Sequence, residues 1–439
     1  MRLISGALER FLSVFAAVRR GEGVTAFLLM VNVFILMTAY YIIKPVREAL
    51  ILAGAGAEIK SYAGAAQAML FLAIVPMYSA FASRVNRIRL INGVTAFFIS
   101  NLFLFYLFAR SGFQVGTAFF LWVGLFNLML TAQFWAFAND VYTQEQGKRL
   151  FAIVGIGSSL GAIFGAEVAG WLFEPVGPYS MMLLAAALLA GCMVLTNWIH
   201  HREGSGAKSG ISEQPLRNGG AFKLVFKHRY LLMIAILVLL SNLVNTTGEF
   251  ILGKTVSEHA KTAVSAAGGS GPTAEVYIGQ FYAGFFFWVN LLSAGLQMFL
   301  VSRIMKYLGI GRALFFLPLI ALGSYSLLAF VPLLSLIRVA KIAENSADYS
   351  IQNTARHALF LRTSREEKYK AKSAIDSFFW RAGDAFSALL VFVGTALAFD
   401  MRRFAMVNVL LVLVWLGVAV AIVRLRRERA TQPETRIAA

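Results

Sequence analysis

The sequence predicts an all-α polytopic membrane protein with twelve transmembrane helices. Of its 439 residues, 59% are hydrophobic and 14% are charged, whereas soluble proteins contain roughly 45–50% apolar and about 25% charged residues. The mean hydropathy is +0.70. Because a membrane-spanning helix needs about 20 mainly apolar residues, most of the chain is taken up by spans, which excludes a large soluble catalytic domain.

Apolar runs bounded by charged residues mark the individual spans. They cover residues 23–46, 61–83, 90–109, 116–139, 151–173, 178–199, 230–252, 276–302, 313–331, 333–355, 374–399 and 403–423. The tenth and eleventh runs are the least apolar and the most charged. A scan for hydropathy alone is therefore expected to miss one of them.

The distribution of basic residues predicts the orientation of the chain. There are 40 Lys and Arg against 22 Asp and Glu, a net charge of +18. The loops on the side of the two termini hold 29 of the basic residues, and the opposite loops hold seven. Because cytoplasmic loops accumulate Lys and Arg, we expect both termini in the cytoplasm, a bacterial-type inner membrane and no nucleic-acid partner.

The five histidines lack metal-ligand spacing, so no metal, cofactor or catalytic group is expected.

Composition shifts divide the chain into five segments. We expect an amphipathic basic segment at 1–22, a six-helix half at 23–199, a cytoplasmic linker at 200–229, a second half at 230–423 and a basic tail at 424–439. The loops at 139–149 and 356–372 weakly echo each other. Two related six-helix halves resemble the major-facilitator architecture, which implies a substrate site near the midplane between the halves.

Charged residues inside the spans are the best sequence guide to function, since each costs roughly 2.5–3.5 kcal/mol at the bilayer centre unless it faces a cavity or a partner. In the tenth span, Arg338, Lys341, Glu344, Asn345 and Asp348 fall within an arc of about 120°. This stripe predicts a cavity-lining face. The alternative is a ladder of local ion pairs, and both interpretations hold if the pairs form a gate.

Polar residues share a face in three further spans. In the eleventh span the shared face carries Asp376, Trp380, Gly383, Asp384 and Ser387, with Arg381 just off the face. In the seventh span it carries Asn242, Asn245, Thr246 and Glu249, and in the eighth span it carries Asn290, Ser293 and Gln297. Such groups suit a polar organic substrate better than a bare cation. The alternative is hydrogen bonding between helices, which is common in membranes.

The end of the first span places Lys44 and Arg47 close to one face with Tyr40, and Pro45 is expected to break the helix between them. Two cations beside an aromatic ring suit a phosphate and a stacked base. The alternative is that Lys44 extends outward to the headgroups and Arg47 makes an ordinary headgroup contact.

The fifth span carries Gly157, Gly161 and Gly165 at four-residue spacing. It lacks the Lys-Ser/Thr of a phosphate-binding loop, so these glycines predict a face for close helix packing. Glu167 lies deep in the same span, where a lone carboxylate needs a cation or a proton.

Three short blocks resemble the non-mitochondrial ATP/ADP translocases, also called the nucleotide transporter family. They are Glu366–Lys372 with the following Ile375-Asp376 and Arg381-Ala-Gly383-Asp384, Ile43–Leu50, and Asp348-Tyr349-Ser350. The resemblance implies a carrier that exchanges ATP for ADP without hydrolysis. It also implies substrate roles for Lys44, Glu167 and Glu249. The chain is shorter than the usual members of this family.

The favoured hypothesis is therefore a carrier of nucleotides or similar phosphorylated anions that works by alternating access. Candidate substrate-binding residues are Lys44, Arg47, Glu167, Asn242, Glu249, Arg338, Lys341, Asp348 and Arg381, and candidate gating or ion-pair residues are Asp140, Glu344, Asp376 and Asp384. The alternative is a proton-coupled carrier of another organic solute, a drug or a lipid-like molecule. A membrane sensor or assembly factor fits less well, because it needs no facing polar stripes.

Overall fold

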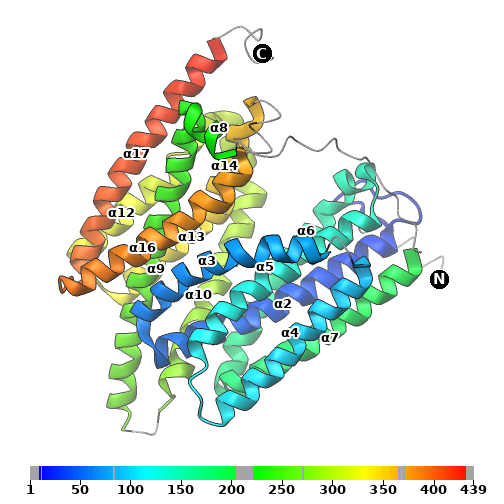
Figure 1. Cartoon of the computed structure of the whole chain (residues 1–439), viewed down its shortest axis with the longest axis horizontal. Helices are drawn as coiled ribbons and strands as arrows, with labels where there is room; N and C mark the ends of the chain where they lie inside the picture. Colours follow the sequence, from blue (N-terminus) through cyan, green and yellow to red (C-terminus); the bar gives the residue numbers. More distant parts are fainter. Residues whose placement is uncertain are drawn as a thin grey trace. The chain divides into compact units, whose positions relative to one another are not determined.

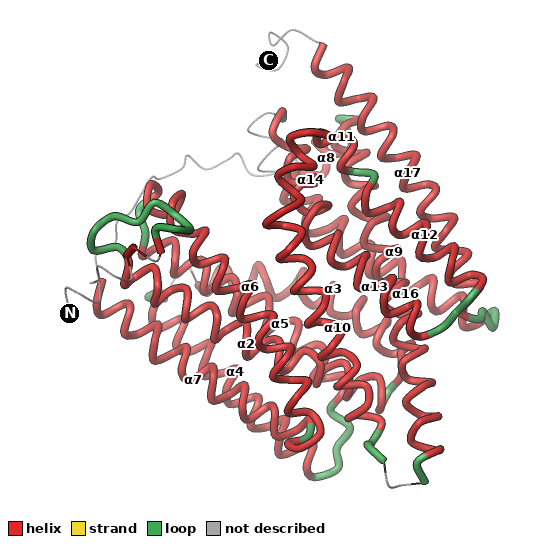
Figure 2. Tube along the Cα trace, turned by 180° about the vertical axis from the view of Figure 1, so that it is seen from behind, coloured by secondary structure: helices red, strands yellow, loops and turns green. Residues whose placement is uncertain are grey.

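A computed structural model describes residues 9–10, 12–82, 85–203, 221–268, 271–363, 367 and 371–431. Within these residues the secondary structure is helical, without a strand (Figure 2). The contacts divide the chain into two compact units. The first unit comprises residues 1–55, 70–213 and 260–290, and the second unit comprises residues 56–69, 214–259 and 291–439.

The first unit is a bundle centred on one buried helix. Its helices are α2 (Gly23–Gly54), α4 (Arg87–Arg110), α5 (Gly116–Val141), α6 (Gln144–Val176) and α7 (Pro178–Glu203), with the second part of α3 (Gly56–Ala82) and the first part of α10 (Ala274–Leu296). Helix α2 packs against α5, α6 and α7 (Figure 1). Because it is surrounded, α2 is apolar on nearly every face.

The glycines of α6 bring its backbone against α2. A Cβ atom at Gly157, Gly161 or Gly165 would collide with the carbonyl oxygens of Met30, Phe34 and Thr38, respectively. This confirms the prediction that the three glycines form a close-packing face. It also explains the spacing, since residues four apart lie on one side of a helix.

The prediction that Pro45 ends the first helix is wrong. Pro45 lies inside α2, which continues to Gly54. A proline removes one hydrogen bond, and in a helix packed on several sides neighbouring groups offset that loss. The chain turns instead at Gly56, whose φ of +89° favours glycine.

The second unit contains a cluster of longer helices and several short helical segments. They are α8 (Ala221–Lys227), most of α9 (Arg229–Ala266), the π-helices η1 (Gln297–Val301) and η2 (Ile304–Leu308), α11 (Gly309–Ala313), α12 (Phe316–Phe330), α13 (Leu334–Ala347), the π-helix η3 (Asp348–Gln352), α14 (Asn353–Ala358), the 3₁₀-helix η4 (Leu359–Arg362), α15 (Lys372–Ala374), the π-helix η6 (Ile375–Phe379), α16 (Trp380–Ala396) and α17 (Met401–Thr431). Helix α12 packs against both α13 and α17.

Each of the twelve predicted spans corresponds to helical structure in the described part of the chain. Nine helices there are long and apolar enough to cross a membrane, and a tenth results if residues 304–313 and α12, which meet at 65°, count as one bent span. The other two are the charged tenth and eleventh spans. They form α13–η3–α14 and η6–α16, and both contain a π-helical stretch, a feature frequent at functional sites.

The predicted terminal segments and linker are described only in part. Residues 1–8, 11, 204–220 and 432–439 lie outside the described residues. So do residues 366 and 368–370 of the block Glu366–Lys372 that carries the family resemblance. Helix α17 continues to Thr431, past the predicted end of the last span at residue 423. The beginning of the basic tail is therefore helical.

Candidate functional site

The centre of the second unit holds a buried ammonium group. Lys341 of α13 is 1% exposed, and its Nζ lies 3.1 Å from Glu344 Oε2 on the same helix. From α9, Asn245 Oδ1 accepts a hydrogen bond from Nζ at 2.8 Å, and Glu249 Oε1 lies 3.8 Å away. An ammonium without water costs several kcal/mol unless it is paired, and these three acceptors supply the pairing.

Further hydrogen bonds complete this group, which we call the Lys341 cluster (Asn245, Glu249, Tyr325, Lys341, Glu344 and Asn345). The Tyr325 hydroxyl of α12 donates to Glu344 Oε2 at 2.9 Å, and Asn345 Nδ2 donates to Glu249 Oε1 at 2.9 Å. Gly248 of α9 leaves the necessary space, because a Cβ atom there would collide with the Tyr325 hydroxyl and stand 3.0 Å from Lys341 Nζ.

A second carboxylate group joins α9 to α16. Asp384 Oδ1 accepts hydrogen bonds from Asn242 Nδ2 at 2.7 Å and from Thr246 Oγ1 at 3.0 Å. Arg381 donates to Asp384 Oδ2 at 3.2 Å. We call Asn242, Thr246, Arg381 and Asp384 the Asp384 cluster. Gly383 lets the two helices approach, since a Cβ atom there would lie 2.9 Å from the Asn242 side chain.

Helix α9 connects the two clusters with one polar face. Asn242 and Thr246 contact α16, whereas Asn245 and Glu249 contact α13. The polar arc predicted on the seventh span is thus distributed between two neighbouring helices. The arrangement places two cations among three carboxylates, so an incoming anion can take the place of a carboxylate at Lys341 or Arg381 without leaving that cation unpaired.

The first unit holds its buried ammonium in an aromatic setting. Lys44 of α2 is 8% exposed, and its Nζ lies 3.9 Å from the centre of the Phe286 ring and 5.0 Å from that of Tyr41. Arg47 forms an ion pair with Glu48 and stacks on Phe120, with Cζ 4.8 Å from the ring centre. Lys44 therefore lies inside the bundle under aromatic rings rather than extending outward.

The other predicted residues are more dispersed. Asp140 pairs with Arg87 at 3.0 Å, with both side chains half exposed, and Asp376 pairs with Lys372 at 3.4 Å. Glu167, Arg338 and Asp348 are half-buried. Of the thirteen candidates, Lys44, Arg47, Asp140 and Glu167 belong to the first unit, and the other nine belong to the second.

The sequence analysis did not identify two structurally important groups, Tyr325 and Glu22. Tyr325 is a single tyrosine in an apolar run, so no pattern distinguishes it. Glu22 precedes the first span, where its carboxylate pairs with Arg149 of α6 at 2.8 Å. The hydrogen bond from Arg149 lowers the pKa of Glu22 to about 2. Spacing along the chain gives no signal for a pair 127 residues apart.

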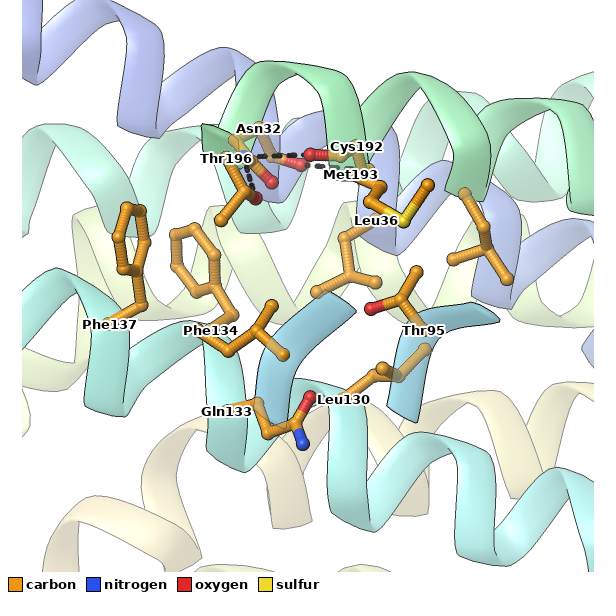
Figure 3. A pocket seen from close by; sticks show the side chains of 12 residues that line it. Asn32, Leu36, Thr95, Leu130, Gln133, Phe134, Phe137, Cys192, Met193 and Thr196 are labelled. Atoms are coloured by element: carbon orange, nitrogen blue, oxygen red, sulfur yellow. Dashed lines mark hydrogen bonds between the residues drawn. The ribbon is translucent and has the colours of Figure 1, made fainter. Parts of the chain in front are cut away.

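Two cavities of the first unit lie apart from these charges. A small one of about 30 Å³ is lined by residues of α2, α4, α5 and α7 (Figure 3). Asn32 donates to Thr196 Oγ1 at 2.8 Å on its wall, and none of the predicted site residues lines it. A larger one of about 520 Å³ lies where several helices end, and the Tyr179 hydroxyl donates there to Glu275 at 3.1 Å.

Known transporters resemble this chain in sequence. "ADP,ATP carrier protein 1" of Chlamydia muridarum is 23% identical over 309 residues, which cover 60% of this chain and 55% of that protein. The protein of the same name from Chlamydia trachomatis matches with the same identity and coverage. The chain thus spans about half the length of the curated relatives it matches. These similarities confirm the resemblance to the ATP/ADP translocase family.

Solved structures show the same fold at low sequence identity. The nucleoside transporter NupG superposes with a TM-score of 0.63 at 14% identity, covering 93% of this chain and all of NupG. A bacterial homologue of the lysosomal transporter Spinster superposes with a TM-score of 0.62 at 12% identity, covering 95% of this chain and all of that one.

A model of the Major Facilitator Superfamily matches residues 24–343, which are 320 of the 439 residues. This match agrees with the nine or ten helices of the described residues that are long and apolar enough to cross a membrane, and with the fold of the solved transporter structures. The chain is a multi-pass membrane transporter and belongs to the Major Facilitator Superfamily.

Proposed function

We propose that this transporter exchanges nucleotides of the ATP/ADP type, or similar phosphorylated anions, by alternating access. The similarity to ADP,ATP carrier proteins favours nucleotides as the substrate class. We further propose that it lies in a bacterial-type inner membrane with both termini in the cytoplasm, because the basic residues concentrate in the loops of that side.

The observation that carries the proposal is the buried ammonium of Lys341. Replacing a buried ion pair by apolar residues is often neutral or stabilising, so the Lys341–Glu344 pair is poorly explained as a device for stability. Binding of a phosphorylated substrate would explain why the Lys341–Glu344 pair is buried here. The phosphate oxygens of that substrate take over Lys341 Nζ, and Glu344 retains the Tyr325 hydroxyl as a partner.

Lys44 supplies a second cation with different neighbours. Flat aromatic rings beside an ammonium group suit a substrate with both a base and phosphates, because every base stacks on an aromatic face. In the proposed cycle the two halves rock against each other, and exchange needs no hydrolysis since the gradient of the counter-substrate drives it.

A proton-coupled carrier of another solute remains the second candidate. Glu249, Glu344 and Asp384 outnumber Lys341 and Arg381 in the two clusters, and a carboxylate that gains and loses a proton would couple transport to the proton gradient. The nucleotide is favoured because both units bury an ammonium group.

Uptake of labelled ATP into proteoliposomes tests the proposal. We expect uptake to require internal ADP and to persist with a proton uncoupler. K341Q should reduce the exchange rate about tenfold or more, since a contact with a charged group contributes about 1.5–3 kcal/mol. K341R should retain most of it. The charge-matched control K306Q changes an exposed lysine and should exchange normally.

Two results would contradict the proposal. If the uncoupler abolishes uptake of ATP, the carrier is proton-coupled. If no nucleotide is taken up with or without internal ADP, although the protein is folded, the substrate belongs to another class.

A further inference from the structure

The second unit carries another charged group, where the tenth and eleventh spans approach the loop between them. We call Arg356, Lys372, Asp376 and Trp380 the mouth cluster. Lys372 Nζ lies 3.4 Å from Asp376 Oδ2, and Arg356 Nε lies 4.0 Å from Asp376 Oδ1. The guanidinium Cζ of Arg356 lies 4.7 Å from the centre of the Trp380 ring. The three charged side chains are 16–30% exposed, so water reaches them without surrounding them.

The mouth cluster leaves hydrogen-bonding capacity unused within the described residues. Arg356 Nε and Asp376 Oδ1 are both buried and without a hydrogen-bond partner there, and their separation of 4.0 Å is too long for a hydrogen bond. Gln352, four residues before Arg356, is 2% exposed, and both its amide oxygen and its amide nitrogen are unpartnered. Buried polar groups are normally satisfied, so a concentration of open donors and acceptors points to a ligand.

The charge and shape of the cluster suit an anion. Two cations face one carboxylate, and stacking on Trp380 holds the planar guanidinium of Arg356 in place while Asn353 Oδ1 accepts one of its hydrogen bonds at 3.2 Å. A guanidinium oriented in this way binds phosphate oxygens in a bidentate manner. Lys372 adds a mobile second charge from the neighbouring helix.

The mouth cluster and the Asp384 cluster share the helical run formed by α15, η6 and α16. Lys372, Asp376, Trp380 and Asp384 follow at intervals of four residues, which keeps them on one side of the helix. Each interval advances about 6 Å. Trp380 also contributes its carbonyl oxygen, which accepts a hydrogen bond from Asn242 Nδ2 at 2.7 Å. The same side of the run α15–η6–α16 thus carries residues of both the mouth cluster and the Asp384 cluster.

We propose that Arg356 and Lys372 form an outer docking site for the phosphate groups of the substrate, from which Asp376 is displaced. Phosphate oxygens replace the carboxylate at both cations, and the Gln352 amide donates to the same anion. The substrate then moves along α16 to Arg381. This inference deepens the proposed function and rests on the phosphorylated substrate named there.

Exchange kinetics in proteoliposomes, with inorganic pyrophosphate as a competitor, test the docking site. We expect R356Q and K372Q each to raise the KM for ATP and the inhibition constant of pyrophosphate about tenfold, with the rate at saturating ATP within about twofold of the parent. R356K keeps the charge but loses the planar fork, so it should fall between. K306Q is again the charge-matched control.

The variant D376N separates a docking site from a plain ion pair. Because it removes the competing carboxylate, D376N should lower both the KM for ATP and the inhibition constant of pyrophosphate. Unchanged constants in R356Q and K372Q, or a raised KM in D376N, would overturn the proposal in favour of an ion pair that only links two helices.

A readout without transport keeps this test distinct from that of the proposed function. Pyrophosphate should raise the melting temperature of the purified full chain in detergent, and R356Q should abolish that shift. If the parent is protected by pyrophosphate but exchanges no nucleotide, the proposed function fails and the anion site stands. If the parent exchanges nucleotide and pyrophosphate protects R356Q equally, the docking site fails and the function stands.

Discussion

Lys44 and Lys341 are buried ammonium groups held in opposite ways. Lys341 lies among oxygen acceptors from three side chains, two of which are carboxylates. The Phe286 and Tyr41 rings form much of the surroundings of Lys44. A ring attracts a cation by about 0.5–2 kcal/mol, whereas loss of one partner from a buried ion pair costs about 3–5 kcal/mol. The difference teaches that a buried ammonium group can lie among carboxylates, as Lys341 does, or against aromatic faces, as Lys44 does.

The largest expected effect comes from breaking the Lys341–Glu344 pair. K341M should lower the free energy of unfolding by about 3–5 kcal/mol, because it leaves Glu344 buried without its cation. The double variant K341M/E344L should recover most of the loss. Unfolding in detergent, followed by helix signal, measures both. Equal stability of the single variant and the parent would show that Lys341 is not the counter-ion of the cluster.

Removal of a single hydroxyl should have a smaller effect on the same cluster. Y325F deletes one of the two donors to Glu344 Oε2 and should cost about 1.5–3 kcal/mol, the usual contribution of a hydrogen bond to a charged group. Y307F is the matched control, since Tyr307 is 71% exposed. Similar losses of stability in Y325F and Y307F would contradict a specific role for the Tyr325 hydroxyl.

The Glu22–Arg149 pair lies outside the spans. It therefore provides an ion pair near water to compare with the two buried ammonium groups, Lys44 and Lys341. The pKa of Glu22 is lowered from 4.5 to about 2, so its stabilising effect is fully present above about pH 4.5 and is lost as the pH falls through 2. E22Q should cost about 1 kcal/mol at pH 7. The difference in stability between parent and E22Q should shrink between pH 4.5 and 2. A constant difference over this range would exclude a charged Glu22 as its cause.

The smallest effect on stability, with a large effect on transport, is expected at Lys44. K44M removes Nζ but keeps the rest of the unbranched side chain against the rings, so we expect the free energy of unfolding to change less than in K341M. Exchange of labelled ATP should nevertheless fall about tenfold or more. If K44M unfolds as readily as K341M, the contrast between the two ammonium groups is wrong.

Hydrophobic runs and helical periodicity predicted much of this molecule. The apolar segments located the spans, and the glycines of α6 were correctly identified as a packing face, because both patterns repeat along a single helix. The polar face of α9 was likewise visible from the spacing of Asn242, Asn245, Thr246 and Glu249. What periodicity does not encode is which neighbouring helix each residue meets.

The remaining features depend on contacts between distant segments. Pro45 predicted a break, but the packing around α2 prevails over the local preference. Tyr325 approaches Glu344 because Gly248 of a third helix makes room, a relation among three segments that no single pattern reports. The open hydrogen-bonding groups of Gln352 and Arg356 are also properties of the folded chain.

The glycine contact between α2 and α6 has a mechanical consequence. Gly157, Gly161 and Gly165 hold the two backbones together over about 12 Å, too closely for one helix to slide past the other without a steric clash. The pair must therefore turn as a single lever. At one end of that lever lies the Glu22–Arg149 pair, and further along it are Glu167 on α6 and Lys44 on α2, so a tilt imposed at the end reorients both charges together.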